Sequence, residues 1–109
     1  MGRRHFGEFE QLLLYAVLHL QDGEDGACGP TIRQTIETRT GRVISPGAIY
    51  TALTRLESRG FVRSSLGDPT PERGGKRKRF YRLRPAGDTA LRATQTTLEK
   101  MARLARLKA

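Results

Sequence analysis

The chain has few of the tryptophan, histidine and cysteine residues that many proteins use in catalytic and metal sites. It has no tryptophan, two histidines and one cysteine, Cys28, so it cannot form an intramolecular disulfide or assemble a zinc site. The sequence shows no paired carboxylates, no nucleophile with its base and no phosphate-binding loop. No run of residues approaches the roughly 18 apolar residues of a membrane span, and the N-terminus lacks the apolar centre of a signal peptide. We therefore expect a soluble cytoplasmic protein that is not an enzyme and uses no metal or cofactor.

What the chain does have is positive charge, concentrated in one segment. The 109 residues carry a net charge of +9. Residues 1–60 hold seven cations and seven anions, whereas residues 61–84 hold eight cations and only two anions. A local excess of this kind indicates a polyanionic partner, for which nucleic acid is a better candidate than a membrane surface.

The length predicts one domain with a single core, and apolar periodicity divides it into elements. We expect helices over 8–20, 30–40, 46–59 and 85–108, a brief strand at 43–45, and two strands over 61–67 and 78–84 that form a hairpin. Gly41 and Gly60 are placed to end the second and third helices. The fold class is therefore mainly α with a small β-hairpin.

The helix over 46–59 has the clearest boundaries and an unusual outer face. Ser45 is a favourable N-cap and Pro46 suits the first helical position. Ile49, Leu53 and Leu56 form its apolar side. The opposite side carries small and polar side chains and one arginine, which leaves room for close approach to base edges and phosphates. The alternative is that this side is an ordinary solvated face. The candidate DNA-binding residues of this helix are Ser45, Gly47, Tyr50 on the flank, Thr51, Thr54, Arg55 and Ser58.

The predicted hairpin has a long, cationic tip. Alternation along its second strand places Phe80 and Arg82 on one side and Tyr81 and Leu83 on the other. Glycines at the tip let the backbone approach a surface closely. The alternative is that these cations are only solvated and protect the edge of the hairpin against pairing with another strand. The candidate DNA-binding residues here are Arg73, Gly74, Gly75, Lys76, Arg77 and Lys78, followed by Arg79.

The last helix is too long and too one-sided to be buried fully on so small a domain. At about 1.5 Å per residue it would span some 36 Å. Along one side of this helix, mostly apolar residues recur at three- and four-residue steps and form a stripe, or seam. The seam predicts a dimer interface with a second copy of the chain. The alternative is that the helix folds back onto its own domain. The seam comprises Leu91, Thr94, Leu98, Met101 and Ala105, with Leu104 beside it.

The order of these elements is that of a winged helix-turn-helix. In that arrangement the third helix lies in the major groove and the hairpin, or wing, contacts the flanking backbone or minor groove. We therefore expect residues 1–84 to form a DNA-binding domain and residues 85–109 a dimerisation helix. Arg55 is the strongest candidate for reading a guanine, and the wing cations would neutralise phosphates. A winged-helix module that contacts RNA or another protein remains the alternative.

Two stretches, SPGAIYTALTRLESRGFV and ERGGKRKRFYRLRPAGDTAL, resemble the PadR-type transcriptional regulators. The resemblance extends over nearly the whole chain, including GEFEQLLLYAVLHL near the start. It implies a bacterial or archaeal repressor that forms a homodimer through its terminal helix and binds a pseudo-palindromic operator. It also implies that Tyr50 and Arg55 belong to the recognition helix and that Gly74, Gly75 and Lys76 belong to the wing. Neither the operator nor any small-molecule effector is identified by the sequence.

Overall fold

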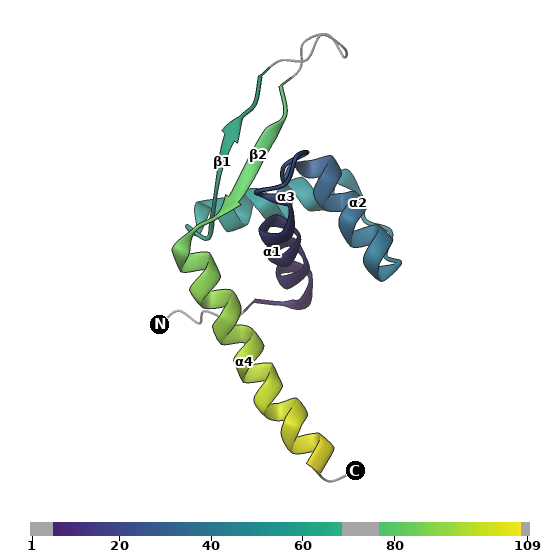
Figure 1. The fold of residues 1–109 in the computed structure, drawn as a ribbon, viewed down its shortest axis with the longest axis vertical. Helices are drawn as coiled ribbons and strands as arrows, with labels where there is room; N and C mark the ends of the chain where they lie inside the picture. Colours follow the sequence, from purple (N-terminus) through teal and green to yellow (C-terminus); the bar gives the residue numbers. More distant parts are fainter. Residues whose placement is uncertain (1–5, 69–76, 108–109) are drawn as a thin grey trace.

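Four helices and one antiparallel hairpin make up the described part of the fold. The computed structural model describes residues 6–68 and 77–107. Figure 1 shows three packed helices, a hairpin that projects from one end of them, and a fourth helix that extends toward the other end. Among the described residues, no helix combines the length and the apolar character needed to cross a bilayer. In chain order the elements are α1 (Glu8–Leu20), α2 (Gly29–Thr40), α3 (Pro46–Ser58), β1 (Val62–Leu66), β2 (Arg79–Leu83) and α4 (Pro85–Leu107).

The helix ends follow the local chemistry of the sequence. The Oγ of Ser45 accepts a hydrogen bond from the backbone N–H of Ala48 at 3.1 Å, which makes Ser45 the N-cap of α3 as predicted. Gly41 and Gly60 follow α2 and α3 with φ of 78° and 85°, values that L side chains rarely adopt. The predicted winged helix-turn-helix fold is confirmed.

The loop between α2 and α3 differs from the prediction, because residues 43–45 form no strand. The backbone N–H of Ile44 donates to Glu37 at 2.8 Å, and its carbonyl accepts from the Nε of Arg33 at 2.7 Å. These two side chains, which also form an ion pair at 3.3 Å, provide the hydrogen bonds that a neighbouring strand would supply. Ile44 itself is 7% exposed, so burial of its side chain rather than strand pairing holds this loop in place.

The hairpin is joined to the helices on its inner side. Val62 pairs with Leu83 and Ser64 with Tyr81, which gives the predicted alternation: Tyr81 is 3% exposed and Arg82 is exposed. The N–H of Tyr81 donates to the carbonyl of Ala27 at 2.8 Å, so the loop after α1 extends the pairing beyond the two strands. The base of the hairpin is therefore part of the core.

The first half of α4 also belongs to this core. A Cβ at Gly87 would lie 2.2 Å from the carbonyl oxygen of Phe61, so only glycine permits this close approach of α4 to the start of the hairpin. Leu91 and Thr94, expected at a dimer interface, are instead 2% and 3% exposed within their own chain. The Oγ1 of Thr94 accepts a hydrogen bond from the N–H of Phe6 at 3.2 Å. These two residues thus belong to the core of their own chain.

Candidate nucleic-acid interface

The outer face of α3 is the candidate interface, and the structure exposes all of it. Ile49, Leu53 and Leu56 on the inner side are at most 1% exposed, whereas Tyr50 on the flank is 64% exposed. The predicted division of this helix into a buried and an open side is therefore present. Five of the side chains line one shallow depression on the surface of α3. The exposed candidates on and before α3 are Ser45, Gly47, Tyr50, Thr51, Thr54, Arg55 and Ser58.

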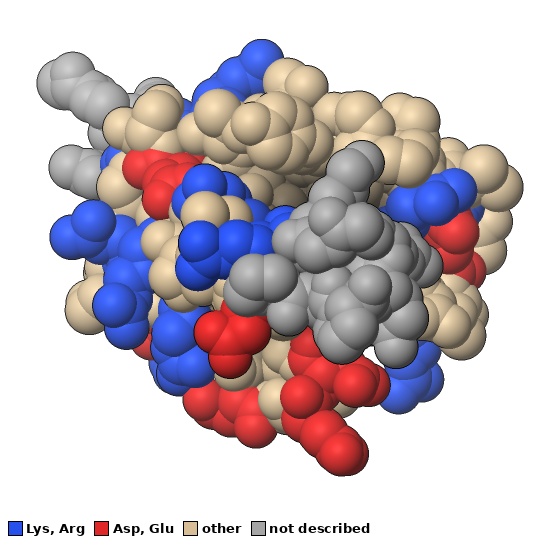
Figure 2. Space-filling model, turned by 90° about the horizontal axis from the view of Figure 1, so that it is seen from above, with Lys and Arg blue, Asp and Glu red and all other residues tan. Residues whose placement is uncertain are grey.

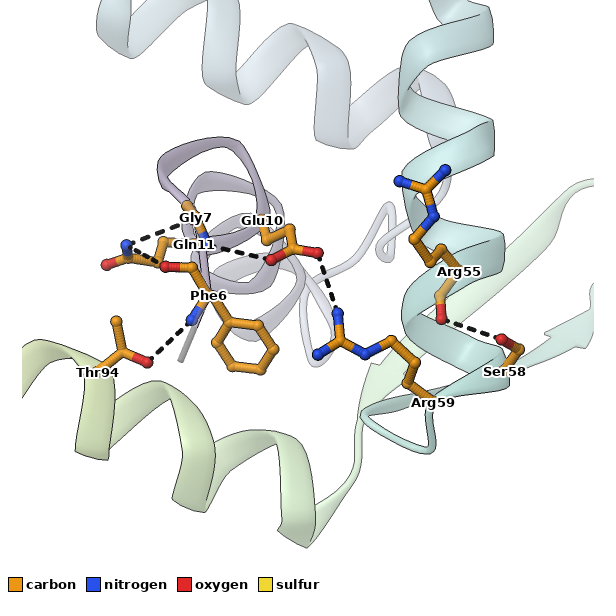
Figure 3. A network of polar contacts seen from close by, with 8 residues as sticks. All are labelled: Phe6, Gly7, Glu10, Gln11, Arg55, Ser58, Arg59 and Thr94. Carbon is orange, nitrogen blue, oxygen red and sulfur yellow. Dashed lines mark hydrogen bonds and ion pairs between the residues drawn. The ribbon is translucent and has the colours of Figure 1, made fainter. Parts of the chain in front are cut away.

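Two arginines near the end of α3 have different surroundings. Arg59 is held by its own chain: its guanidinium pairs with Glu10 at 3.3 Å and lies 5.1 Å from the centre of the Phe61 ring. Arg55 forms no ion pair with any described residue, and its guanidinium points away from this network in Figure 3. The Oγ of Ser58 at 3.2 Å and the N–H of Arg59 at 3.1 Å both donate to the backbone carbonyl of Arg55, and these bonds do not involve its guanidinium. The charge of Arg55 is therefore available to an external partner.

The N-terminus of α3 is open to close approach. A Cβ at Gly47 would have no neighbour within 4 Å, so nothing in the fold requires glycine there. Glycine in a helix costs up to about 1 kcal/mol relative to alanine. The positive end of the helix dipole at such a terminus favours a bound anion such as phosphate. Gly47 thus fits a site where a phosphate backbone comes near the helix.

Two of the predicted wing cations lie just before β2, at the end of the hairpin opposite to the Val62–Leu83 pair. Arg77 and Lys78 are both exposed. The Nε of Arg77 donates to the carbonyl of Gly67 at 2.7 Å, while the Lys78 side chain has no ion-pair partner among the described residues. In Figure 2 most of the visible Lys and Arg lie on the left of the view, and most of the visible Asp and Glu lie toward its lower edge. Arg73, Gly74, Gly75 and Lys76, the other wing candidates, lie outside the described residues.

Glu57 connects α3 to the hairpin and was not among the predicted site residues. Its carboxylate accepts hydrogen bonds from the N–H of Ser64 at 3.1 Å and from the Ser64 hydroxyl at 2.8 Å. Arg79 donates to the same hydroxyl at 3.0 Å. Glu57 follows Tyr50 by seven residues and therefore shares its flank of the helix, a pattern that could have indicated contact with the hairpin. This cluster fixes the position of the wing relative to the outer face of α3.

The described residues hold no group of three or more His, Cys, Asp or Glu that could bind a metal ion. Cys28 is buried at 1% exposure, and its Sγ lies 3.5 Å from the Oγ1 of Thr31. The exposed chemistry of this region therefore consists of hydroxyls, backbone N–H groups and arginine and lysine cations. Such groups donate hydrogen bonds to phosphates and base edges.

The sequence and the structure of the chain are both similar to those of known proteins. Residues 17–93 match the profile of the transcriptional regulator PadR-like family. The transcriptional regulator Rv3488 of Mycobacterium tuberculosis is 35% identical over 90 residues, which are 83% of this chain and 78% of that protein. A PadR family transcription regulator from Clostridium difficile R20291 has a similar structure, with a TM-score of 0.71 and 19% identity over 93% of this chain and 97% of its own. The structure of Bacillus subtilis PadR in complex with operator DNA is similar too, with a TM-score of 0.63 and 17% identity over 79% of this chain and 45% of that one.

Proposed function

Since the chain belongs to the PadR-like family of transcriptional regulators, a family of regulators rather than enzymes, we propose that it binds double-stranded DNA through the outer face of α3 and the hairpin. In this proposal α3 lies in the major groove and Arg55 reads a base edge. Thr51, Thr54 and Ser58 contribute adaptable hydroxyl contacts, and Tyr50 contacts the groove from the flank.

One observation carries this proposal: α3 presents an open face that its own fold does not use. Its side chains are exposed, Arg55 has no ion-pair partner among the described residues, and Gly47 has open space where a Cβ would stand. A helix face of small polar residues with one unpaired arginine suits the approach of a duplex. The reported complex of the related Bacillus subtilis protein with operator DNA supports this partner.

The hairpin would supply affinity that does not depend on sequence. Tyr50 of α3 and Lys78 beside β2 line one cleft, so the flank of the recognition helix and the start of β2 are neighbours. In this proposal Arg77 and Lys78, together with Arg73, Gly74, Gly75 and Lys76, would contact the flanking phosphates. Each neutralised phosphate releases condensed counterions, which makes such binding steeply dependent on salt.

We further propose that the protein acts as a homodimer. Beyond Thr94, α4 exposes Leu98, Met101 and Leu104 at 54%, 62% and 55%, and Ala105 is exposed beside them. Large apolar side chains in such a row are typical of an interface with another chain. A two-fold dimer would present two copies of α3 to the DNA, which matches a pseudo-palindromic operator. Residues 1–84 would then bind DNA and residues 85–109 would dimerise, with the first turns of α4 shared by both parts.

Repression is the direction of regulation that we propose, because a dimer bound across an operator blocks access to it. A reporter gene placed behind a selected operator should be less active when the protein is present and more active when it is deleted. Higher expression in the presence of the protein would instead make it an activator.

DNA binding is tested by titrating the protein against duplex DNA and against duplex RNA of equal length over a series of salt concentrations. We expect tight binding to duplex DNA, weaker binding to RNA, and a steep decrease in affinity as salt rises. Binding that favours RNA, or that does not change with salt, would support the alternative of a winged-helix module for RNA or protein contacts.

A further inference from the structure

The hairpin is attached to the rest of the chain from both of its edges at one residue pair. Ser64 of β1 lies opposite Tyr81 of β2. The N–H of Ser64 donates to the Glu57 carboxylate of α3 at 3.1 Å, and the N–H of Tyr81 donates to the carbonyl of Ala27 at 2.8 Å. This is therefore a non-hydrogen-bonded pair of the antiparallel ladder, whose N–H groups face the two outer edges. The two bonds connect the hairpin to α3 on one side and to the loop after α1 on the other.

The two connections differ in the groups that make them. The bond to Ala27 joins two backbone groups, so no side-chain substitution removes its acceptor. The bond to α3 depends on one side chain, because the acceptor is the carboxylate of Glu57. Both oxygens of this carboxylate also accept from the Ser64 hydroxyl, at 2.9 and 2.8 Å. The position of β1 relative to α3 is therefore sensitive to the residue at position 57.

The same cluster holds a cation of the hairpin beside α3. The Nη1 of Arg79 donates to the Ser64 hydroxyl at 3.0 Å. Arg79 also lines the cleft that Tyr50 and Lys78 line. Hydrogen bonds thus run from Glu57 on α3 through Ser64 on β1 to Arg79 at the start of β2. They connect the flank of the recognition helix to the part of the hairpin that carries the described wing cations.

We propose that Glu57 is a positioning residue for DNA binding: through Ser64 it holds the hairpin at the distance from α3 at which the wing cations and the outer face of α3 contact the same duplex. This inference rests on the proposed function. Without the Glu57 carboxylate, the hairpin would have to be ordered when the duplex binds. Ordering a segment on binding lowers the affinity.

The charge of Glu57 separates this role from a purely electrostatic one. A carboxylate near a polyanion repels it, so its removal should by itself strengthen binding to every duplex. A positioning role predicts the opposite result for the operator, namely weaker binding. Glu57→Gln distinguishes the two effects, because its side-chain carbonyl can still accept from Ser64 although the charge is lost.

The position of the hairpin is tested first without DNA. Spin labels are placed at Thr54→Cys on α3 and Ser65→Cys on β1, two exposed sites, in a Cys28→Ala background. Pulsed electron paramagnetic resonance then measures the distribution of distances between the two labels. We expect a broader distribution in Glu57→Ala and the parent distribution in Glu57→Gln. An unchanged distribution in Glu57→Ala would overturn the proposal.

A milder variant keeps the test decisive if Glu57→Ala does not fold. Ser64→Ala removes the hydroxyl and its bonds to Glu57 and Arg79, but it keeps the N–H that donates to Glu57. It should broaden the distribution of label distances in the same way but less. A distribution equal to that of the parent chain would mean that this cluster does not hold the hairpin.

The effect on DNA binding is measured with a selected operator duplex and a random duplex. Glu57→Ala should raise the Kd for the operator at least about fivefold, and the Kd for the random duplex less than about twofold, because a non-specific complex requires no fixed register. Glu57→Gln should bind the operator within about threefold of the parent chain. Tighter binding of both duplexes by Glu57→Ala would reduce Glu57 to a repelling charge and overturn the proposal.

Glu10→Ala is the matched control for lost charge and lost stability. The Glu10 carboxylate also accepts a backbone N–H, that of Gly7 at 3.1 Å, and pairs with Arg59 at 3.3 Å, but it lies on α1. This variant should leave the ratio of operator to random affinity unchanged. Equal decreases of this ratio in Glu10→Ala and Glu57→Ala would assign the effect to stability and overturn the proposal.

A cycle of variants tests whether Glu57 acts through the wing. In a chain with Arg77→Ala and Lys78→Ala, the hairpin has fewer phosphate contacts to position. Adding Glu57→Ala to this chain should therefore raise the Kd for the operator less than about twofold. A further loss as large as in the parent chain would mean that Glu57 acts independently of the wing. If the chain bound no duplex at all, the proposed function would fail, whereas the label distances would still decide whether Glu57 holds the hairpin.

Discussion

The outer face of α3 and the second half of α4 are both exposed, but their chemistry differs. On α3 the exposed groups are hydroxyls, a glycine, a tyrosine and Arg55, which has no ion-pair partner in the part of the chain that the structure describes. Beyond Thr94 on α4 they include Leu98, Met101, Leu104 and Leu107, the last of which is 77% exposed. Neither surface contributes to the core of its own chain, so both point to external partners. A hydrated polyanion suits the first surface and a second apolar helix suits the second.

The two halves of α4 also differ in burial. Gly87, Ala90, Leu91 and Thr94 of α4 are buried against the rest of the chain, whereas the turns that follow project from it in Figure 1. The exposed second half of α4 is therefore held in place by the first half, which packs in the core. In a dimer, this rigid connection would fix the distance between the two copies of α3.

The largest effect is expected from placing a charge on the α4 seam. Leu98→Asp should raise the dissociation constant of the dimer at least about a hundredfold, because a carboxylate buried without a partner costs several kcal/mol. The isolated chain should still fold, since Leu98 is 54% exposed within it. Sedimentation at several concentrations measures the effect. Thr96→Asp, an exposed change on the other side of α4, is the control, and a dimeric Leu98→Asp variant would remove this interface.

Removing the described wing cations should weaken all duplexes alike. For Arg77→Ala combined with Lys78→Ala we expect a loss of about ten- to a hundredfold in affinity near 0.15 M salt, and a salt slope smaller by about two. The control is Arg92→Ala with Arg106→Ala, which removes the same charge from α4 side chains that pair with Asp88 and Glu99. Equal losses in the two double variants would mean that net charge, and not the hairpin, supplies the affinity.

Arg55 should carry sequence discrimination. Arg55→Ala is expected to cost about 1–3 kcal/mol of discrimination at one base position of each half-site, measured by competition among operators with single substitutions. Arg59→Ala removes the same charge nearby on the chain, but this arginine is held by Glu10 and Phe61. It should lower stability and leave base preference intact. If Arg55→Ala weakened every operator equally, Arg55 would be a phosphate contact.

The smallest effect on folding is expected at Gly47. Gly47→Ala should leave the free energy of unfolding unchanged or raise it by up to about 1 kcal/mol, yet reduce affinity for DNA because the added methyl group lies where the backbone approaches. Gly87→Ala should instead destabilise the chain, since its Cβ would meet the Phe61 carbonyl at 2.2 Å. Thermal unfolding and duplex titration of both variants separate the two roles. Undiminished DNA binding by Gly47→Ala would place the duplex away from this terminus.

The sequence predicts α3 well because several local signals agree. Ser45, Pro46 and Gly60 define its ends, and the apolar period fixes which side is buried. The seam of α4 was predicted less well, because periodicity shows that a stripe is apolar but not which surface covers each turn. Leu91 and Thr94 meet the chain's own core only because Gly87 brings the start of α4 against Phe61, a tertiary contact.

Other features depend on contacts between distant residues and could not be predicted. The predicted strand at 43–45 is absent because the side chains of Arg33 and Glu37 satisfy the backbone of Ile44. The bond from Ser64 to Glu57 requires the hairpin to lie beside α3. The cleft between α3 and the start of β2 likewise exists only once these elements have packed together.

The most direct test of DNA binding through the outer face of α3 is affinity cleavage. In a Cys28→Ala background, Thr54→Cys on α3 and Thr96→Cys on α4 would each carry an iron–EDTA group, and the cut positions would be mapped on an operator duplex. We predict strong cleavage from position 54 at two sites about one helical turn apart, about 10 base pairs, or a multiple of it, and little from position 96. Equal cleavage from both positions, or none from position 54, would contradict the assignment of α3 as the DNA-reading helix.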